Sequence, residues 1–233
     1  YDPWRGTFYP DGLARTKQLA FAAERLTAIE INATYYGRQK PATFAAWAKA
    51  VPDGFRFSVK ASRYATNRKR LSEGKESVDK FLSQGLTELG DRLGPILWQF
   101  MATKRFEAED FSGFLDLIPD RQDGVPLRHV LEVRHESFVD PAFYALAKAR
   151  GMAIAFADSD DFAQIDVATA DFTYARLQRA TEECATGYGV AALDEWADTL
   201  KGWSKQGDVF AYFIAGAKVR NPAAAQALIA RLG

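Results

Sequence analysis

The sequence predicts an α/β protein built as a (β/α)₈ barrel, and three observations support this fold class. Seven short runs of apolar or β-branched residues recur along the 233-residue chain, helical patterns lie between most of them, and no linker or change of composition divides it. Alternation of strand and helix over a whole chain indicates parallel strands joined by crossover connections. We therefore expect a single barrel domain over residues 1–233, with an open doubly wound sheet as the alternative.

The expected strands and helices follow one another in a regular order. The strands cover residues 28–33, 55–61, 95–100, 129–135, 152–158, 171–178 and 208–215. Helical patterns cover residues 14–26, 41–50, 76–93, 111–118, 141–150, 191–206 and 221–232, and only residues 158–171 separate two strands without one. Asp140-Pro141 and Asn221-Pro222 are expected helix starts, because each pairs a capping side chain with a proline at the first helical position.

Two features decide between the barrel and the open sheet. No glycine-rich GxGxxG turn and no P-loop follows any expected strand, which argues against a doubly wound nucleotide-binding sheet. Seven strands would leave a barrel with an open edge, and proteins normally cover such edges. Since the chain starts in YDPWRG without a methionine, we expect the first strand of the barrel to precede Tyr1.

Composition and charge limit the class of protein. The 30 Lys and Arg residues equal the 30 Asp and Glu residues, so the net charge gives no reason to expect a nucleic acid or an anionic membrane as a partner. No run of about 18 apolar residues indicates a membrane span. With a single cysteine, Cys184, and no visible signal peptide, we expect a cytoplasmic protein.

Polar residues gather on one face and at the end of several expected strands. In LEVRH, Glu132 and Arg134 oppose Leu131, Val133 and His135, because strand side chains alternate between faces. Applied to the other strands, alternation and position give an inward or mouth-facing set of Glu30, Asn32, Ser58, Lys60, Gln99, Asp158, Tyr174, Arg176 and Gln178. Helices cover the outside of a barrel, and its active site lies at the carboxyl ends of the strands. We therefore expect this set to converge at the barrel mouth.

The charged members of this set balance one another. The three carboxylates are Glu30, Glu132 and Asp158, and the three cations are Lys60, Arg134 and Arg176. One interpretation is a buried ion-pair network that only stabilises the barrel. Six charges at one end favour a functional site instead, because clustered ionisable groups in a cleft are where shifted pKa values occur.

The chemistry of these side chains suggests their roles. Arg134 and Arg176 can each hold a carboxylate or phosphate through paired hydrogen bonds. The expected catalytic residues are Glu30, Lys60, Glu132, His135 and Asp158, and the expected substrate-binding residues are Asn32, Tyr36, Arg63, Gln99, Arg134 and Arg176. By its intrinsic pKa His135 would be a proton shuttle, but alternation places it opposite Arg134, where it would only support the site. His129, at the start of its strand, is expected to be structural.

We expect neither a metal nor a cofactor. Only two histidines exist, both on one expected strand, and no Cys or His spacing resembles a zinc site. Mg²⁺ held by two carboxylates remains an alternative, since that ion needs few protein ligands. No GxSxG nucleophile motif is present.

The stretch KASRYATNRKRL forms a local basic patch. Its members are Lys60, Arg63, Arg68, Lys69 and Arg70, with Tyr64 among them. The simplest interpretation is a solvated loop. The alternative is a phosphate contact, either of a nucleic acid or of a nucleotide.

The strand motifs resemble those of the domain-of-unknown-function-72 family, the YecE-like proteins. IEINATYYG, FRFSVKASRYATNRKRL, LGPILWQF, LEVRHESF and YARLQ follow the order of the family's EINxTFY, FxVKxPRxxTHxxxL, LGPxLxQLP, E-F/V-RH-xSW and YxRLHG. The resemblance covers nearly the whole chain and implies a (β/α)₈-like barrel without an established activity. It also implies a Gly-rich first strand that would lie just before Tyr1.

The chain both matches and departs from the family pattern. The matching positions are Glu30, Asn32, Tyr36, Lys60, Arg63, Gln99, Glu132, Arg134, His135, Asp158 and Arg176. Asn67 replaces the motif histidine, Gln178-Arg179 replaces His-Gly, and Phe213, Ile214 and Ala215 stand where the family tends to have Phe-Asn-Asn. These departures would alter the substrate, or abolish activity, if the lost side chains carried chemistry in relatives.

Two functions are therefore expected as alternatives. The first is a metal-independent acid–base enzyme, a hydrolase or isomerase, that acts on a small anionic or phosphorylated substrate. The second is a non-catalytic protein that binds a phosphorylated ligand or a nucleic acid through the basic loop.

Overall fold

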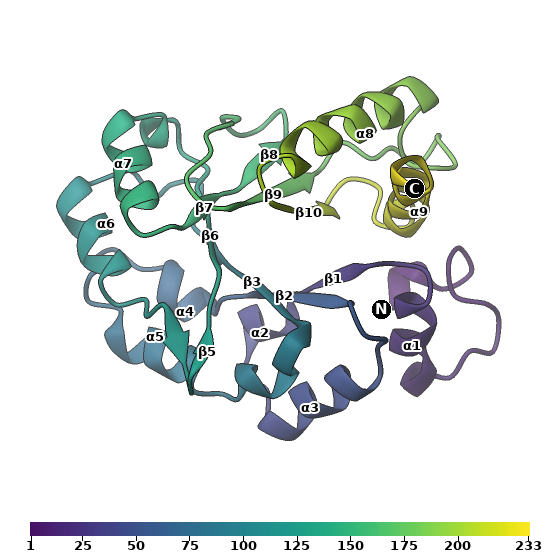
Figure 1. Cartoon of the computed structure of the whole chain (residues 1–233), viewed down its shortest axis with the longest axis horizontal. Coiled ribbons are helices and arrows are strands. Elements are labelled where there is room, and N and C mark those ends of the chain that lie inside the picture. The colour runs from purple at the N-terminus through teal and green to yellow at the C-terminus, as the bar shows by residue number, and fades with distance from the viewer.

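The computed structural model describes residues 1–233 and has a mixed α/β architecture built on two parallel sheets. One sheet has the strand order β1-β2-β3-β6-β7 and the other β10-β9-β8, and all neighbouring strands within them run parallel. The two sheets face each other, with the helices on the outside (Figure 1). The carboxyl ends of the strands therefore meet around one region.

All seven expected strands are present. They are β1 (Ala28–Ile31), β2 (Arg56–Lys60), β3 (Leu93–Gln99), β6 (His129–Glu132), β7 (Ala153–Ile154) with β8 (Phe156–Asp158), β9 (Phe172–Leu177) and β10 (Asp208–Phe213). The expected strand 152–158 is split at Ala155, so that β7 pairs with β6 and β8 pairs with β9. A short antiparallel hairpin of β4 (Arg121–Gln122) and β5 (Val125–Pro126) was not predicted.

The expected helices are also present, several of them shorter than predicted. They are α1 (Gln18–Ala23), α3 (Pro41–Lys49), α5 (Lys75–Leu82), α6 (Ala108–Leu115), α7 (Pro141–Ala149), α8 (Val190–Ser204) and α9 (Asn221–Leu232). The pattern over 76–93 ends at Leu82 and resumes as a 3₁₀ segment, Leu86–Arg92, after Gly85. Gly85 has φ +103° and a Cβ there would lie 2.8 Å from Pro41, so only glycine fits this position.

Six short segments were not predicted as separate elements. They are α2 (Ala33–Tyr36), α4 (Arg63–Thr66) and the 3₁₀ turns Asp2–Trp4, Arg15–Lys17, Leu86–Arg92 and Glu136–Phe138. The hydroxyl of Thr34 in α2 donates to the carbonyl of Lys60 at 2.7 Å, which ties α2 to the end of β2. This contact places the residues that follow β1 beside the Lys60 side chain.

One of the two expected helix caps is confirmed. The Asp140 side chain accepts a hydrogen bond from the backbone N–H of Ala142 at 2.7 Å, and α7 begins at Pro141. The expectation for Asn221 was wrong, because α9 already includes Asn221, Arg220 occupies the capping position, and no side chain caps the helix. Residues between β8 and β9 contain no helix, as the sequence predicts.

Three apolar cores fill the layers. A central core between the sheets contains Leu97, Val130, Ala153, Ala155, Phe172, Tyr174 and Tyr212. The largest core, with 33 buried residues that include Trp98 and Phe138, joins the five-stranded sheet to the helices from α1 to α7. A core of 10 residues joins the three-stranded sheet to α8 and α9. Strands such as β3 and β6 thus have an inner and an outer buried face.

The sheets do not form one closed barrel. β1 and β10 lie near each other, but no hydrogen bonds pair them, and β7 and β8 belong to different sheets. The prediction of a (β/α)₈ barrel is therefore confirmed only as a mixed α/β fold with parallel strands in sequence order. No helix combines the length and apolar character that crossing a bilayer requires.

Lys104 and Asp110 form a buried ion pair that fixes the loop after α4. The Asp110 carboxylate accepts from Lys104 at 2.8 Å and from the backbone N–H groups of Leu71 and Ser72 at 3.0 and 2.9 Å. Although burial opposes ionisation, hydrogen bonds from Lys104, Ser72 and Leu71 hold the pKa of Asp110 well below its usual range. The basic loop is thus anchored on α6.

His129 predicts a specific loss of stability in acid. Its ring accepts from the Trp98 indole at 3.1 Å and contacts the Pro119 carbonyl at 2.9 Å, and burial lowers its pKa to about 4. The unfolded chain binds a proton near pH 6.5 and the folded chain does not, so this contribution is complete above pH 6.5 and is lost as pH falls towards 4. It amounts to about 3 kcal/mol, and His129→Gln should remove that part of the pH dependence in urea unfolding.

The other histidine provides the control. His135→Gln keeps His129 and should unfold with the pH profile of the wild type. Identical profiles for His129→Gln and the wild type would contradict a neutral, buried His129.

Candidate functional site

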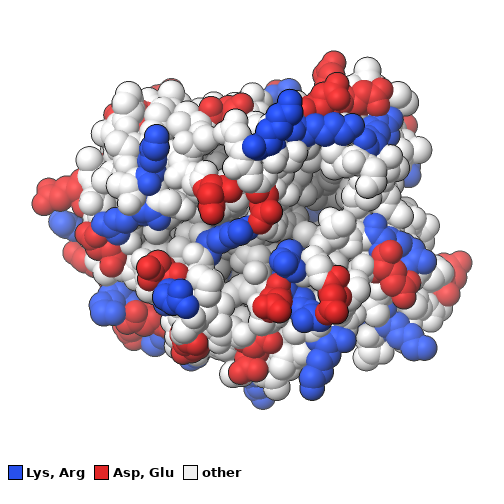
Figure 2. Space-filling view, in the orientation of Figure 1, with Lys and Arg blue, Asp and Glu red and all other residues white.

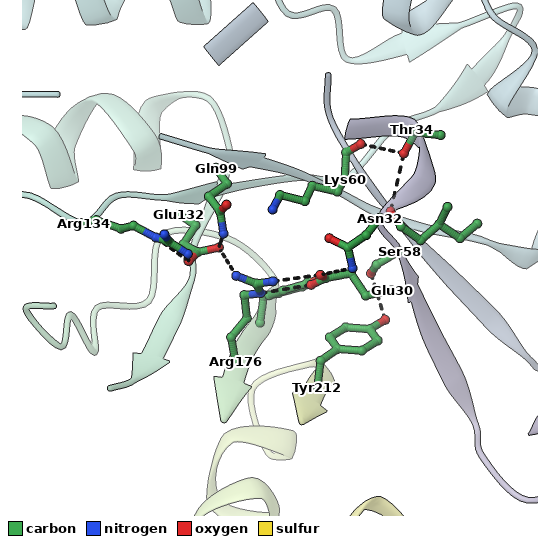
Figure 3. A network of polar contacts seen from close by, with 12 residues as sticks. Glu30, Asn32, Thr34, Ser58, Lys60, Gln99, Glu132, Arg134, Arg176 and Tyr212 are labelled. Carbon is green, nitrogen blue, oxygen red and sulfur yellow. Dashed lines mark hydrogen bonds and ion pairs between the residues drawn. The ribbon is translucent and has the colours of Figure 1, made fainter. Parts of the chain in front are cut away.

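Arg176 on β9 joins the two sheets by reaching carboxylates on the opposite one. Its Nη2 lies 2.8 Å from Glu30 Oε1 at the end of β1, and its Nη1 lies 2.5 Å from Glu132 Oε2 at the end of β6. The three side chains are 4%, 3% and 0% exposed. Figure 3 shows Arg176 between the two carboxylates. The sequence predicted this convergence, and the structure brings these three residues together.

Glu30 accepts four hydrogen bonds and has no free lone pair directed at the cavity. Its Oε1 accepts from Arg176 Nη2 at 2.8 Å and Asn32 Nδ2 at 3.1 Å, while Oε2 accepts from Tyr174 at 2.9 Å and Arg176 Nε at 3.0 Å. A carboxylate offers about four such acceptor positions. The geometry therefore holds Glu30 in one orientation.

Glu132 is equally saturated. Arg134 donates from Nε and Nη2 to its Oε1 at 3.1 and 3.0 Å, and Gln99 Nε2 and Arg176 Nη1 donate to its Oε2 at 2.8 and 2.5 Å. Burial raises the pKa of Glu132, but Arg176 and Arg134 outweigh burial and the pKa lies below its usual value. Glu132 is thus an ionised anchor for two arginines.

Arg176 is stabilised in its charged form. Burial lowers the pKa of its guanidinium, but Glu132 and Glu30 raise it above the ordinary arginine value. Below it, the hydroxyls of Tyr212 and Ser58 lie 2.8 Å apart, and the ring centroids of Tyr174 and Tyr212 lie 5.1 Å apart. These hydroxyl groups and rings form the inner side of the site, next to Arg176.

Lys60 at the end of β2 differs from the other charged groups. Its side chain is 8% exposed and no carboxylate lies within 4.0 Å of its Nζ. Burial and the nearby Arg176 lower the pKa of Lys60 to about 8, against the opposing effects of Glu30 and Glu132. In Figure 3 the amine ends near Gln99 and Asn32 without a marked contact. The Lys60 amine therefore ends at the cavity without a carboxylate or hydrogen-bond partner.

Tyr35 and Asn67 extend the surroundings of Lys60. The Lys60 amine lies 4.1 Å from the centre of the Tyr35 ring, a cation–π distance. Asn67 Nδ2 donates to the Tyr35 hydroxyl at 3.1 Å. Asn67 thus contacts the aromatic ring beside Lys60. The specific contact of Tyr35 with Lys60 depends on helix α2, which was not predicted.

Asp158 does not join the expected cluster. Its Cα pairs in register with Leu177, whose side chain lies in the outer core, whereas Ala157 pairs with the inward-facing Arg176. Asp158 Oδ1 instead contacts Arg179 Nε at 3.0 Å. Burial, opposed by Arg179 and assisted by Asp160, raises the pKa of Asp158. The alternation Ala153, Ala155, Ala157 along the strand already implied this outward direction.

Three further expected residues lie outside the hydrogen-bonded network. His135 accepts from the backbone N–H of Ser137 at 3.0 Å and caps the following 3₁₀ turn. The exposed Arg63 guanidinium lies 5.3 Å from the centre of the Tyr64 ring. Tyr36 is 66% exposed and lines the mouth of the site without a polar contact to the network. Their predicted roles stay predictions.

A cavity of about 830 Å³ opens onto the network. Its polar lining includes Glu30, Asn32, Lys60, Gln99, Arg134 and Arg176, and its apolar walls come from α1, β1 and β10. Gln178 and Ile214 line it as well. Figure 2 shows the hollow with charged side chains of both signs around it. The site is thus accessible to a small molecule.

The charge of this site differs from the predicted balance. With Asp158 outside, two carboxylates, Glu30 and Glu132, face three cations, Lys60, Arg134 and Arg176. No group of three or more His, Cys, Asp or Glu side chains is placed to hold a metal ion. The arrangement has one excess positive charge and suits an anionic group.

Comparison with protein families gives one match over the whole chain. The model of the family described as "Protein of unknown function DUF72" matches residues 1–233. The UPF0759 protein YunF of Bacillus subtilis (strain 168) is 25% identical over 189 residues, which is 77% of this chain and 64% of that protein. The chain thus aligns with less than two thirds of this relative.

Two solved structures share the fold. A DUF72 family protein (EF0366) of Enterococcus faecalis V583 has a TM-score of 0.73 at 18% identity, over 94% of this chain and 95% of that one. A DUF72 family protein (TM1631) of Thermotoga maritima MSB8 has a TM-score of 0.73 at 21% identity, over 98% and 93% of the two chains. At this identity the similarity concerns the arrangement of strands and helices.

Replacing Arg176 should destabilise the fold strongly. Arg176→Met leaves Glu30 and Glu132 buried without the cation between them, and breaking a buried ion pair on one side costs about 3–5 kcal/mol. The free energy of unfolding in urea should fall by this amount at pH 7. The loss should shrink at lower pH, because protonation of either glutamate relieves the repulsion.

An exposed ion pair provides the matched control. Arg128 contacts Asp208 at 2.5 Å with side chains 44% and 62% exposed. Arg128→Met should therefore cost about 0–1 kcal/mol. Equal losses in the two variants would show that Arg176 does not support the fold as argued.

Proposed function

This chain belongs to the DUF72 family of proteins of unknown function, and we propose that it binds a small anionic or phosphorylated ligand in the cavity at the strand ends. We further propose that it acts on this ligand by metal-independent acid–base chemistry, as a hydrolase or isomerase. The two parallel sheets would then be parts of a (β/α)₈-type barrel, in which such a site at the carboxyl ends of the strands is the usual arrangement.

The observation that supports ligand binding is the unpaired Lys60. A buried ammonium normally has a carboxylate or carbonyl partner, because desolvating a charge without compensation is costly. Here the two glutamates of the cluster are saturated by other donors, so neither can turn to Lys60. An anion that enters the cavity would supply the missing partner and neutralise the excess charge.

Arg134 is the second expected contact to the ligand. Glu132 engages its Nε and Nη2, which leaves Nη1 without a carboxylate contact. The guanidinium also lies 4.5 Å from the centre of the Phe162 ring, and the side chain is 23% exposed. Glu132 and the Phe162 ring already hold the Arg134 guanidinium, so binding an anion would cost Arg134 little conformational entropy.

Acid–base chemistry would depend on Lys60 rather than on the glutamates. A general acid or base is most effective when its pKa lies near the working pH. Burial and Arg176 lower the pKa of Lys60 to about 8, whereas Arg176 and Arg134 keep Glu132 ionised and hydrogen-bonded. Lys60 is thus the group in the cluster best suited to exchange a proton with a bound ligand near neutral pH.

The basic loop supports the second candidate, a phosphate or nucleic-acid contact without catalysis. Arg63 lies over the Tyr64 ring and both are exposed. However, Arg70 contacts Glu73 at 3.3 Å and Arg68 donates to the Glu73 carbonyl at 3.0 Å. These contacts leave Lys69 as the best probe of this loop.

Lys60→Met should weaken phosphate binding by about tenfold or more, equivalent to ~1.4 kcal/mol. The substitution removes the unpaired cation but leaves the arginines and glutamates in place. Isothermal titration with inorganic phosphate at low ionic strength measures the effect. Lys69→Met is the control from the basic loop and should bind phosphate as the wild type does. A loss in Lys69→Met but not in Lys60→Met would favour the basic loop instead.

A further inference from the structure

We infer that Lys60 is a nucleophile that forms an imine with a small anionic carbonyl compound, such as a 2-oxo acid or a phosphorylated ketone. This inference rests on the proposed function for the anionic group of the ligand, and on the geometry of Lys60 alone for the covalent step. It names a substrate class and a reaction for the cavity.

Two buried lysines, Lys60 and Lys104, differ in the contacts of their amines. Lys60 and Lys104 are each 8% exposed. Lys104 Nζ donates to Asp110 at 2.8 Å and to the Lys69 carbonyl at 2.9 Å, so its amine is held by two acceptors. Lys60 has neither a carboxylate within 4.0 Å nor a hydrogen-bond acceptor for its amine, and it lines the cavity. Only Lys60 is both reachable and free to react.

The surroundings of Lys60 favour its neutral form on balance. Burial and the cations Arg176 and Arg134 oppose protonation of Lys60, while the carboxylates of Glu30 and Glu132 oppose its loss of charge. The pKa is lowered on balance because burial is the largest of these effects. Desolvation beside another cation is a recognised way to activate an amine nucleophile.

The covalent step is balanced without any further reactant. The neutral amine adds to the carbonyl carbon and gives a carbinolamine, which loses its hydroxyl as water after protonation and leaves an iminium. The sum is amine plus carbonyl plus one proton, giving iminium plus water. The iminium carries the same single charge as the Lys60 ammonium, so the charge that faces Glu30 and Glu132 is unchanged.

Tyr35 is the neighbouring group suited to assist the loss of water. Its ring centre lies 4.1 Å from the Lys60 amine, and its hydroxyl accepts from Asn67 at 3.1 Å. A phenol that accepts one hydrogen bond still has its own proton to donate. In this role Asn67 would orient Tyr35 and act as a positioning residue.

Reductive trapping tests the inference on the intact protein. The chain is incubated with pyruvate and cyanoborohydride, which delivers hydride to the iminium carbon and makes the adduct permanent, and peptides are mapped by mass spectrometry. We expect one adduct at Lys60 and none at Lys104, with a rate that rises with pH and levels off above about pH 8 because the neutral amine reacts. Lys60→Arg should lose the adduct, whereas Lys69→Met, the control from the basic loop, should form it as the wild type does.

A neutral reagent of similar size separates this inference from the proposed function. If neither pyruvate nor propanal forms an adduct at Lys60, the nucleophilic role of Lys60 is refuted, even if phosphate still binds. An adduct with propanal but not with pyruvate would refute the anionic substrate class and count against the anion site. A Lys60 adduct that forms no faster than one at Lys104 would also refute the inference.

Discussion

A buried arginine between two buried glutamates is the interaction on which the rest of this structure depends. Arg176 lies 146 residues from Glu30 and 44 from Glu132 along the chain, and it connects β9 of one sheet with β1 and β6 of the other. Removing three charges from water costs several kcal/mol for each ion unless good hydrogen bonds replace the water. Tyr174, Asn32, Gln99 and Arg134 supply those bonds. The carboxyl ends of strands from both sheets are thereby held in one arrangement.

This requirement separates the polar residues of the site into two kinds. The glutamates must keep all of their acceptor positions occupied, so they hold the arginines in place and are poorly suited to exchange protons themselves. The Lys60 amine does not have to pair with either glutamate, because Arg176 already pairs with both. The pair of Lys104 and Asp110 shows how the same chain treats a buried lysine with a structural role, by giving it a carboxylate and a carbonyl. The contrast argues that Lys60 is kept for a partner that enters the cavity.

Much of this arrangement could be predicted from the sequence, and the errors have physical reasons. The strands were recognisable because each forms a short, mostly apolar run. The polar residues late in these runs correctly marked Glu30, Lys60, Gln99, Glu132, Arg134 and Arg176 as neighbours. Asp158 was predicted to lie in the cluster because it ends a strand. Strand alternation, however, puts it on the face opposite to Ala157, and it points away from the cluster. The four-residue helix α2 has too few residues for a periodic signal, so the contact of Tyr35 with Lys60 could not be predicted. Closure of the sheets depends on long-range pairing, which local patterns do not determine.

The misplacement of Asp158 changes the interpretation of the whole cluster. With three carboxylates and three cations the site would be neutral, and a purely structural ion-pair network would explain it. With Asp158 directed outward to Arg179, two carboxylates face three cations, and the unbalanced charge belongs to the one residue without a partner. A network that served only stability would not need this amine, because Lys60 forms none of the side-chain ion pairs that join the two sheets through Arg176. The proposed anion-binding role would account for a lysine at this position.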